Sequence, residues 1–487
     1  MTADGSPRIS DIVLMDARAL AAEIVSRRIS CVDVMCAFLD HIDTFNPKVN
    51  AIVALQERKN LLTQAQERDA QVARGEIMGP LHGFPLAVKD LSWVKGISST
   101  SGSPILKDFV PREDDLPVER LRTAGAIFIG KTNTPEFGLG SHTYNPVYGA
   151  TLNAYDQTKS AGGSSGGAAV ALALRMLPVA DGSDYGGSLR NPAGWNNVFG
   201  FRTSFGVVPA DNDDVWLPSM GVTGPMARSV TDLAMLLAVQ AGYDPRAPLS
   251  VAGDGRRFLG PLEADFRGKR IAWLGDFDGF APYEAGVLDL CRTALKSFES
   301  LGCVVEQAIP EYPLAPVWHA FIKLRHWQVC AGLGGLYSDP SKRALMKPEV
   351  IWEVENGLKL SASEVTAASV IRTEWFNATR RLFARYDFLI APTAQVFPFD
   401  VGEKWPRGIA QQKMQSYHEW MKAVCLITMT GCPSLAVPAG FSPKGLPMGL
   451  QIIAPVHHEM DCLKLALAYE RATDWTKRRL PQLLQNA

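Results

Sequence analysis

Residues 162–190 contain two glycine-rich turns, each with a serine at its centre: Ser164 and Ser188. The segment begins Gly162-Gly163-Ser164-Ser165-Gly166-Gly167 and ends Asp184-Tyr185-Gly186-Gly187-Ser188-Leu189-Arg190. Ser188 follows Ser164 by 24 positions, and the apolar stretch between them predicts one helix. Glycine permits positive φ and close approach of a second group, so these glycines indicate hydroxyl and N–H groups exposed for chemistry. A buried helix alone would need no such glycines.

A third candidate lies upstream, in Gly83-Phe84-Pro85-Leu86-Ala87-Val88-Lys89-Asp90. The apolar run predicts a buried strand that ends at Lys89. Lysine is seldom fully buried without a partner, and desolvation lowers its pKa, so its neutral amine can act as a general base. A lone lysine at a strand end more often faces solvent. The combination with two serines makes Lys89 a candidate base.

These motifs together resemble those of the amidase signature family, serine hydrolases that use a Ser-Ser-Lys triad. Three further stretches match the family in the same order: residues 130–137 (GKTNTPEF), 224–230 (GPMARSV) and 445–451 (GLPMGLQ). One Gly-Ser-rich loop would be weak evidence, but several separated motifs with the 24-residue serine spacing are specific. The resemblance implies an α/β fold: a single large domain over residues 8–482, with a mixed β-sheet core covered by helices on both sides.

The resemblance also implies a role for each motif residue. Ser188 is expected to be the acylated nucleophile, Ser164 the bridging serine on a cis peptide bond after Gly163, and Lys89 the base. The proton of Ser188 would pass through Ser164 to Lys89, without a metal or organic cofactor. The implied oxyanion hole consists of the backbone N–H groups of Tyr185, Gly186, Gly187 and Ser188.

Four polar residues beside these positions are expected to support the site rather than to transfer protons. Ser165 is expected to cap the helix that starts at Gly166 or to hydrogen-bond locally. Asp90, Asp184 and Arg190 are expected to form charge-paired contacts that orient the catalytic groups.

The substrate pocket is expected to differ from that of typical family members, because Tyr185, Asn191 and Trp195 depart from the family pattern. Apolar side chains and one amide predict a pocket for an aryl or medium-sized apolar amide. The candidates are Phe137, Trp216, Leu217, Met220, Trp318, Trp327, Gln395 and Phe397. Core packing is the alternative for each aromatic residue. An acyl-enzyme mechanism also accepts aryl esters and carbamates, the latter including urethanes.

Composition is typical of a soluble enzyme. The chain has 487 residues, 47% of them hydrophobic, and a formal net charge of -1, so it can bury a large core and has no overall attraction for nucleic acid. The first residues lack the pattern of a signal peptide, and no run of about 18 apolar residues predicts a membrane span, so we expect a cytoplasmic enzyme. Eight cysteines without a Cys-x-x-Cys pair favour buried thiols over disulfides or a zinc site. The family resemblance makes a homodimer possible.

Helical periodicity predicts an N-terminal helical layer (about residues 8–60), and the family resemblance implies a catalytic core (about 61–240) and a variable pocket region (about 311–382). Helical spacing marks residues 17–25, 30–42, with Ser30 as a cap, and 285–301. Further strands are expected at residues 126–129, 177–180, 268–274, 386–393 and from residue 304 onward.

Two other enzyme classes and one relative within the family are alternatives. Residues 162–166 fit the G-x-S-x-G elbow of α/β hydrolases, but that class leaves residues 184–190 and Lys89 unexplained. Gly130-Lys131-Thr132 suits a phosphate-binding loop poorly, because the residues before it read as a strand. Within the family, the glutaminase subunit of the tRNA-dependent amidotransferase remains an alternative. The segment before Gly224 lacks the Ser-Leu-Asp pattern of that subunit.

Overall fold

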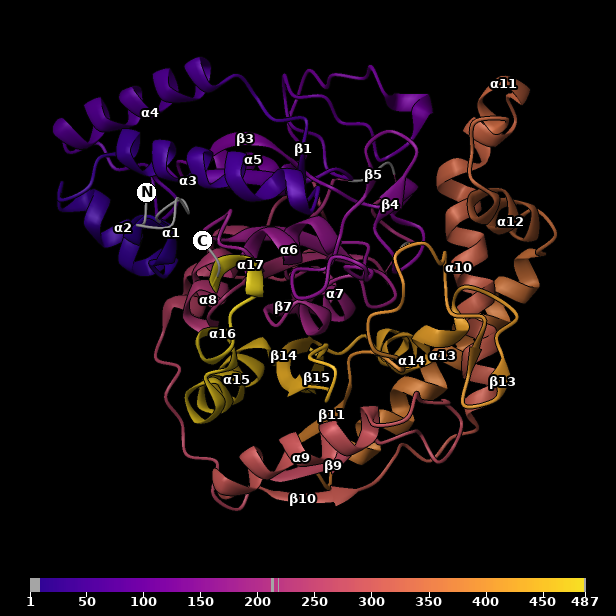
Figure 1. Ribbon diagram of the computed structural model, residues 1–487. Helices are drawn as coiled ribbons and strands as arrows, with labels where there is room; N and C mark the ends of the chain where they lie inside the picture. Colours follow the sequence, from indigo (N-terminus) through magenta and orange to yellow (C-terminus); the bar gives the residue numbers. More distant parts are fainter. Residues whose placement is uncertain (1–8, 212–213, 218, 486–487) are drawn as a thin grey trace.

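The computed structural model describes residues 9–211, 214–217 and 219–485 (Figure 1). Its centre is an eight-stranded mixed sheet with the order β10-β9-β11-β15-β14-β7-β8-β6. The strands are β6 (Ala180–Asp184), β7 (Phe199–Arg202), β8 (Val222–Ala227), β9 (Arg270–Trp273), β10 (Val304–Gln307), β11 (Phe388–Pro392), β14 (Ser434–Phe441) and β15 (Pro447–Ile453). Strands β9, β10 and β11 are parallel, and all other neighbours in this sheet are antiparallel.

Helices cover both faces of this sheet. Helix α7 (Arg190–Trp195) packs on β14 and β15 from one face, and α9 (Val287–Ser300) and α15 (Glu459–Thr473) pack on the same strands from the other. Helix α6 (Gly166–Ala173) lies beside α7, and α8 (Val230–Gln240) beside α15 (Figure 1). The predicted fold, a single domain with a mixed sheet between helices, is confirmed.

The strand that ends at Lys89 does not belong to this sheet. Strand β2 (Pro85–Lys89) pairs in parallel with β3 (Ile127–Thr132), and β1 (Ile52–Val53) pairs with the other edge of β3. These strands share a second hydrophobic core with α6 and the N-terminal helices α1 (Asp11–Leu14), α2 (Ala17–Val25), α3 (Cys31–Phe45) and α4 (Arg58–Ala73). Because Gly130, Lys131 and Thr132 lie within β3, they do not form a phosphate-binding loop.

Most of the expected elements are present. The helices expected from residues 17, 30 and 285 are α2, α3 and α9, and Ser30 forms a capping box at the start of α3. The strand expected at residues 177–180 is wrong in its bounds. Strand β6 begins only at Ala180, opposite Met226 near the end of β8, so β8 offers no partners to Leu177 and Pro178.

A helical region at the right of Figure 1 follows β10. It consists of α10 (Leu314–Tyr337), α11 (Pro340–Arg343), α12 (Pro348–Gly357) and α13 (Ala362–Phe383), with α14 (Lys422–Thr430) beside α10 and α13. A third hydrophobic cluster joins α10 and α12 to Leu139, close to the serine loop. The remaining elements are α5 (Leu116–Thr123), β4 (Tyr144–Asn145), β5 (Gly149–Ala150), β12 (Gly408–Ile409), β13 (Gln412–Lys413), α16 (Trp475–Arg478) and α17 (Gln482–Gln485).

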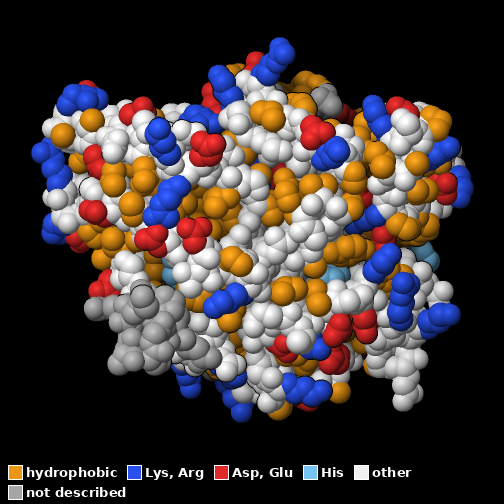
Figure 2. All heavy atoms as spheres, turned by 45° about the horizontal axis from the view of Figure 1, so that its top comes forward, with side chains coloured by type: hydrophobic (Ala, Val, Ile, Leu, Met, Phe, Trp, Pro, Cys, Tyr) orange, Lys and Arg blue, Asp and Glu red, His pale blue; other side chains and the backbone are white. Residues whose placement is uncertain are grey.

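The face shown in Figure 2 carries Lys and Arg side chains intermixed with Asp and Glu, and hydrophobic side chains lie in groups between them. Among the helices of the described ranges, none is both long and apolar enough to span a membrane.

Candidate active site

Lys89 is the last residue of β2, and its side chain is buried against three serines. The residue is 1% exposed. Its Nζ lies 2.7 Å from Ser164 Oγ, 2.8 Å from Ser165 Oγ and 3.0 Å from Ser183 Oγ. The structure therefore brings the predicted base into direct contact with the predicted bridging serine, with no histidine between them.

The charge of Lys89 is controlled by burial. Desolvation lowers the pKa of Lys89 to about 7, although the nearby charges of Asp181 and Asp184 raise it. Asp181 also accepts a hydrogen bond from the backbone N–H of Lys89 at 3.0 Å, and burial raises the pKa of this carboxyl to about 6. Near neutral pH the amine of Lys89 can lose its proton and serve as a base.

The Ser164 loop has the geometry that the resemblance implies. The Gly163–Ser164 peptide bond is cis. Ser141 Oγ donates to the carbonyl of Gly163 at 2.5 Å, and Thr143 Oγ1 donates to the carbonyl of Gly162 at 2.8 Å. These two hydroxyls fix the carbonyls that precede Ser164.

Ser165 does not cap the helix that follows it, contrary to one expectation. Its side chain makes no capping hydrogen bond, and the N–H of Gly166 at the start of α6 donates to Thr143 Oγ1 at 3.2 Å. Instead, Ser165 Oγ accepts from Lys89 Nζ and donates to the carbonyl of Ser183 at 3.3 Å. Ser165 therefore acts locally, by holding the amine of Lys89.

Ser188 is half-buried at the end of the loop from Tyr185. Its carbonyl accepts a hydrogen bond from Ser165 N at 3.2 Å, which joins the two serine loops. The N–H of Gly187, which the resemblance assigns to the oxyanion hole, donates to Asp184 Oδ1 at 2.9 Å and is already used. The N–H groups of Tyr185, Gly186 and Ser188 have no acceptor among the described residues, so they are free to face an oxyanion.

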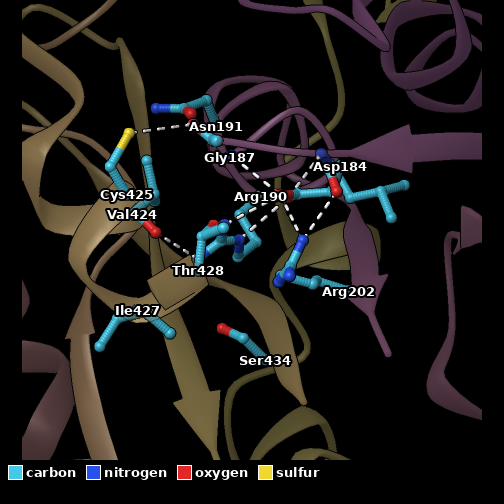
Figure 3. Close-up of polar contacts among 12 residues, drawn as sticks. Asp184, Gly187, Arg190, Asn191, Arg202, Val424, Cys425, Ile427, Thr428 and Ser434 are labelled. Carbon is cyan, nitrogen blue, oxygen red and sulfur yellow. Dashed lines mark hydrogen bonds and ion pairs between the residues drawn. The ribbon is translucent and has the colours of Figure 1, made fainter. Parts of the chain in front are cut away.

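A buried ion-pair network fixes this loop to α14 (Figure 3). Arg190 contacts Asp184 through Nη2 at 2.9 Å and Nε at 3.0 Å, and Arg202 Nη1 lies 3.3 Å from Asp184 Oδ1. Burial would raise the pKa of Asp184, but the two guanidinium groups hold it well below its usual value. Arg190 also donates to Thr428 Oγ1 at 2.8 Å and to the carbonyl of Val424 at 3.0 Å. The predicted charge pairing of Asp184 and Arg190 is present.

Asp90 supports a different turn. It accepts from Thr100 Oγ1 at 2.6 Å and from Thr100 N at 3.0 Å, and it lies 3.8 Å from Lys131 Nζ. Burial raises the pKa of Asp90, and Lys131 opposes that shift. Asp90 therefore anchors the loop after β2 by a charge-paired contact.

Several of the predicted pocket residues lie in places that do not support a role in substrate binding. Met220, Gln395 and Phe397 are buried in the main hydrophobic core or beside it. The Gln395 amide is engaged at both ends, since Nε2 donates to the carbonyl of Pro282 at 2.8 Å and Oε1 accepts from Ala423 N at 3.3 Å. Two others are largely exposed: Trp216 (65%) and Leu217 (64%). Trp327 is half-buried against the main core.

Other aromatic residues lie beside the two loops. Phe137 precedes Gly138, where an added Cβ would lie 3.5 Å from Ser164 Oγ. An added Cβ on Gly186 would lie 3.5 Å from Phe321 Cζ, and Trp318 stacks on Phe321 with ring centroids 5.5 Å apart. Phe137 and Trp318 were candidates from the sequence, whereas Phe321 was not.

Sequence reasoning also missed the residues that surround Lys89 and the Ser164 loop. Asp181 and Ser183 lie two apart on β6, so they share one face of that strand, and both contact Lys89. The spacing of these two polar residues on one strand is the sequence pattern that could have identified them. The contacts of Ser141 and Thr143 with the Ser164 loop had no signal of that kind, because they depend on the folding of a separate loop.

Comparisons with known proteins agree on one family. The family model named Amidase matches residues 33–463. The acylamidase of Rhodococcus erythropolis is 31% identical, over 96% of this chain and 97% of that protein. A glutamyl-tRNA(Gln) amidotransferase subunit of a Picosynechococcus species is 32% identical, over 96% of this chain and 99% of that protein.

Solved structures show the same relationship. A bacterial aryl acylamidase of the amidase signature family superposes with a TM-score of 0.90 at 28% identity, covering 98% of this chain and 99% of that one. The 6-aminohexanoate cyclic dimer hydrolase complexed with substrate gives a TM-score of 0.84 at 25% identity, covering 98% and 100%. The chain belongs to the amidase signature family of hydrolases, which act on C–N bonds.

Proposed function

We propose that this protein is a serine amidohydrolase that cleaves carboxamide bonds through an acyl-enzyme. Ser188 is the nucleophile, Ser164 is the bridging serine and Lys89 is the base. The observation that carries this proposal is the contact of 2.7 Å between Lys89 Nζ and Ser164 Oγ in a buried setting that lowers the pKa of the lysine to about 7. A buried amine that is neutral near pH 7 has the protonation state that a base requires.

The reaction proceeds in two halves. Ser188 Oγ attacks the substrate carbonyl while its proton passes to Ser164 and the proton of Ser164 passes to Lys89. The free N–H groups of Tyr185, Gly186 and Ser188 stabilise the oxyanion, and each such donor typically contributes about 2.7 to 4 kcal/mol. Lys89 returns the proton to the leaving amine through Ser164. A water molecule then attacks the acyl-enzyme by the same relay and releases the acid.

The proposed substrates are aryl or medium-sized apolar amides. Phe321 approaches Gly186 and carries Trp318 stacked on it, and Phe137 precedes Gly138, which lies beside Ser164. Aromatic surfaces in such places favour a flat apolar group. The name of one relative, an aryl acylamidase, points in the same direction, and that of another, an acylamidase, points to amide hydrolysis. Aryl esters and carbamates, including urethanes, present the same carbonyl to Ser188 and are proposed as further substrates.

A matched panel tests this substrate class. The panel contains acetamide, benzamide, 4-nitroacetanilide, a 4-nitrophenyl ester and an aryl carbamate, each with wild type and Ser188→Ala. We expect kcat/KM to be highest for an aryl compound and to vanish in the variant. Highest kcat/KM for acetamide would contradict the proposed preference, and activity that survives Ser188→Ala would contradict the proposed mechanism.

A second candidate is the glutaminase subunit of a tRNA-dependent amidotransferase. Two amidotransferase relatives favour it, because this chain aligns with nearly the whole length of each at 32 and 33% identity. Its test is to purify the chain alone and with co-expressed partner proteins, and to measure ammonia release from glutamine. Glutaminase activity only in the complex, without hydrolysis of any aryl amide by the chain alone, would support this candidate against the first.

A further inference from the structure

Arg325, on one face of α10, lies against the loop that contains Ser188. Trp318, Phe321 and Arg325 are spaced by three and four residues on this helix, so they share a face. Phe321 approaches Gly186, and the guanidinium of Arg325 lies over the ring of Tyr185, with its Cζ 4.5 Å from the centroid. The side chain of Arg325 therefore lies against the proposed oxyanion segment.

A buried carboxylate fixes the position of Arg325. Arg325 Nε lies 3.4 Å from Glu353 Oε1, and Tyr417 donates its hydroxyl to the same oxygen. His418 Nε2 lies 2.9 Å from that oxygen, and His326 Nδ1 lies 2.6 Å from Glu353 Oε2. Burial would raise the pKa of Glu353, but these partners hold it well below its usual value. Glu353 therefore stays ionised, and four side chains contact its carboxylate: Arg325, His326, Tyr417 and His418.

Within the described ranges, the outer end of the guanidinium is not held by a second carboxylate. Arg325 is 9% exposed, and its Nη1 and Nη2 donate no hydrogen bond within 3.5 Å to the described residues, although the Tyr417 hydroxyl lies near the guanidinium. The neighbouring Tyr185 hydroxyl is buried and also lacks a partner within the described ranges. A second cation, Lys347, lies near Arg325. Burial lowers the pKa of Lys347 to about 8, and the charge of Arg325 lowers it further. Forked N–H donors in such a place suit a planar oxyanion.

We propose that Arg325 is a substrate-binding residue that takes a carboxylate carried by the amide substrate, and that Glu353 is the residue that positions it. This inference rests on the proposed function of the same site. Trp318 and Phe321 would pack against the part of the substrate between the carboxylate and the scissile carbonyl. The preferred substrate is then an amide with an anionic end, in the acyl group or in the leaving amine.

Two pairs of compounds test the proposal and distinguish the two ends. The acyl pair is N-(4-nitrophenyl)succinamic acid and its methyl ester, and the leaving-group pair is 4-acetamidobenzoate and its methyl ester. We expect wild type to prefer the acid of one pair. Arg325→Gln should then lower kcat/KM for that acid by about 10- to 100-fold, mainly through KM, because a hydrogen bond to a charged group is lost. For the anilide bond of the matching ester, kcat/KM of Arg325→Gln should stay within about 3-fold of the wild-type value.

Controls separate binding from support of the loop. Arg292→Gln removes a cation whose side chain is 54% exposed on α9, and it should leave both members of each pair unchanged. Arg325→Lys keeps the charge without the fork, so it should restore part of the preference for the acid. Thermal unfolding verifies that each variant is folded, and Arg325→Lys serves if Arg325→Gln does not fold.

Two results would overturn the proposal. One is equal loss on acid and ester in Arg325→Gln, which would make Arg325 a support for Tyr185 alone. The other is the absence of a preference for either acid in wild type. Failure of the proposed function is recognised separately, because neither ester would then show anilide hydrolysis that depends on Ser188.

Discussion

Lys89 Nζ and Ser164 Oγ lie 2.7 Å apart, although the lysine comes from the small β1-β3-β2 sheet and the serine from the loop before α6. The contact depends on the packing of these two parts of the domain. Asp181 on β6 contributes to it, since its carboxylate accepts a hydrogen bond from the backbone N–H of Lys89. The position of the base is therefore fixed by the main sheet as well as by its own strand.

Replacing the base should abolish turnover while leaving the fold intact. We expect Lys89→Met to lower kcat by at least about 100-fold, since general bases typically contribute 10²- to 10⁴-fold. Lys89→Arg should be equally inactive near neutral pH, because arginine keeps its proton. The measurement is kcat with an aryl anilide, accompanied by circular dichroism. Wild-type turnover in either variant would exclude Lys89 as the base.

The rate should depend on pH through Lys89. Desolvation lowers the pKa of this lysine to about 7, so the neutral form becomes dominant as the pH rises above that value. We expect kcat/KM to rise through about pH 7 and then to level off. A pH profile from 5 to 9 checks this, and an optimum on the acid side with a decline toward neutrality would contradict the proposed base.

Ser165 should tune that midpoint. Its hydroxyl accepts from Lys89 Nζ at 2.8 Å and uses its own proton on the carbonyl of Ser183, so it stabilises the charged form of the lysine. Ser165→Ala should therefore shift the pH midpoint downward, by about one to two units, because a hydrogen bond to a charged group contributes about 1.5 to 3 kcal/mol. Ser300→Ala, on an exposed part of α9, is the control. An upward shift in Ser165→Ala would show that Ser165 stabilises the neutral amine.

Asp184 should matter for stability as well as for activity. Asp184→Asn removes the anion that compensates Arg190 and Arg202, which are both fully buried. We expect the free energy of unfolding to fall by about 3 to 5 kcal/mol, because a buried charge without its partner is strongly unfavourable. Urea denaturation measures the change. A loss below about 1 kcal/mol would show that the network does not stabilise the fold.

Much of the fold was predictable because local patterns determined it. The amphipathic spacing of residues 17–25 and 285–301 and the apolar runs before Lys89 and at residues 386–393 each formed the expected element. The assignment of β2 and β3 to a separate sheet was not predictable, because strand pairing depends on contacts distant in sequence.

The site was predictable to a similar extent. The glycines around Ser164 and Ser188 indicated the two loops, because their spacing is a property of the sequence itself. One of the four predicted oxyanion donors, the Gly187 N–H, is hydrogen-bonded to Asp184, a contact that only the loop geometry reveals. The cluster of Arg325 and Glu353 had no signal in the sequence, since α10 and α12 meet through tertiary packing.

The most direct test of the account is intact-protein mass spectrometry after treatment with a fluorophosphonate, with Ser188→Ala in parallel and peptide mapping of the product. The account predicts one adduct, located on Ser188, that is absent from the variant together with anilide hydrolysis. An adduct and activity that both persist in Ser188→Ala would place the nucleophile elsewhere and contradict the Ser-Ser-Lys assignment.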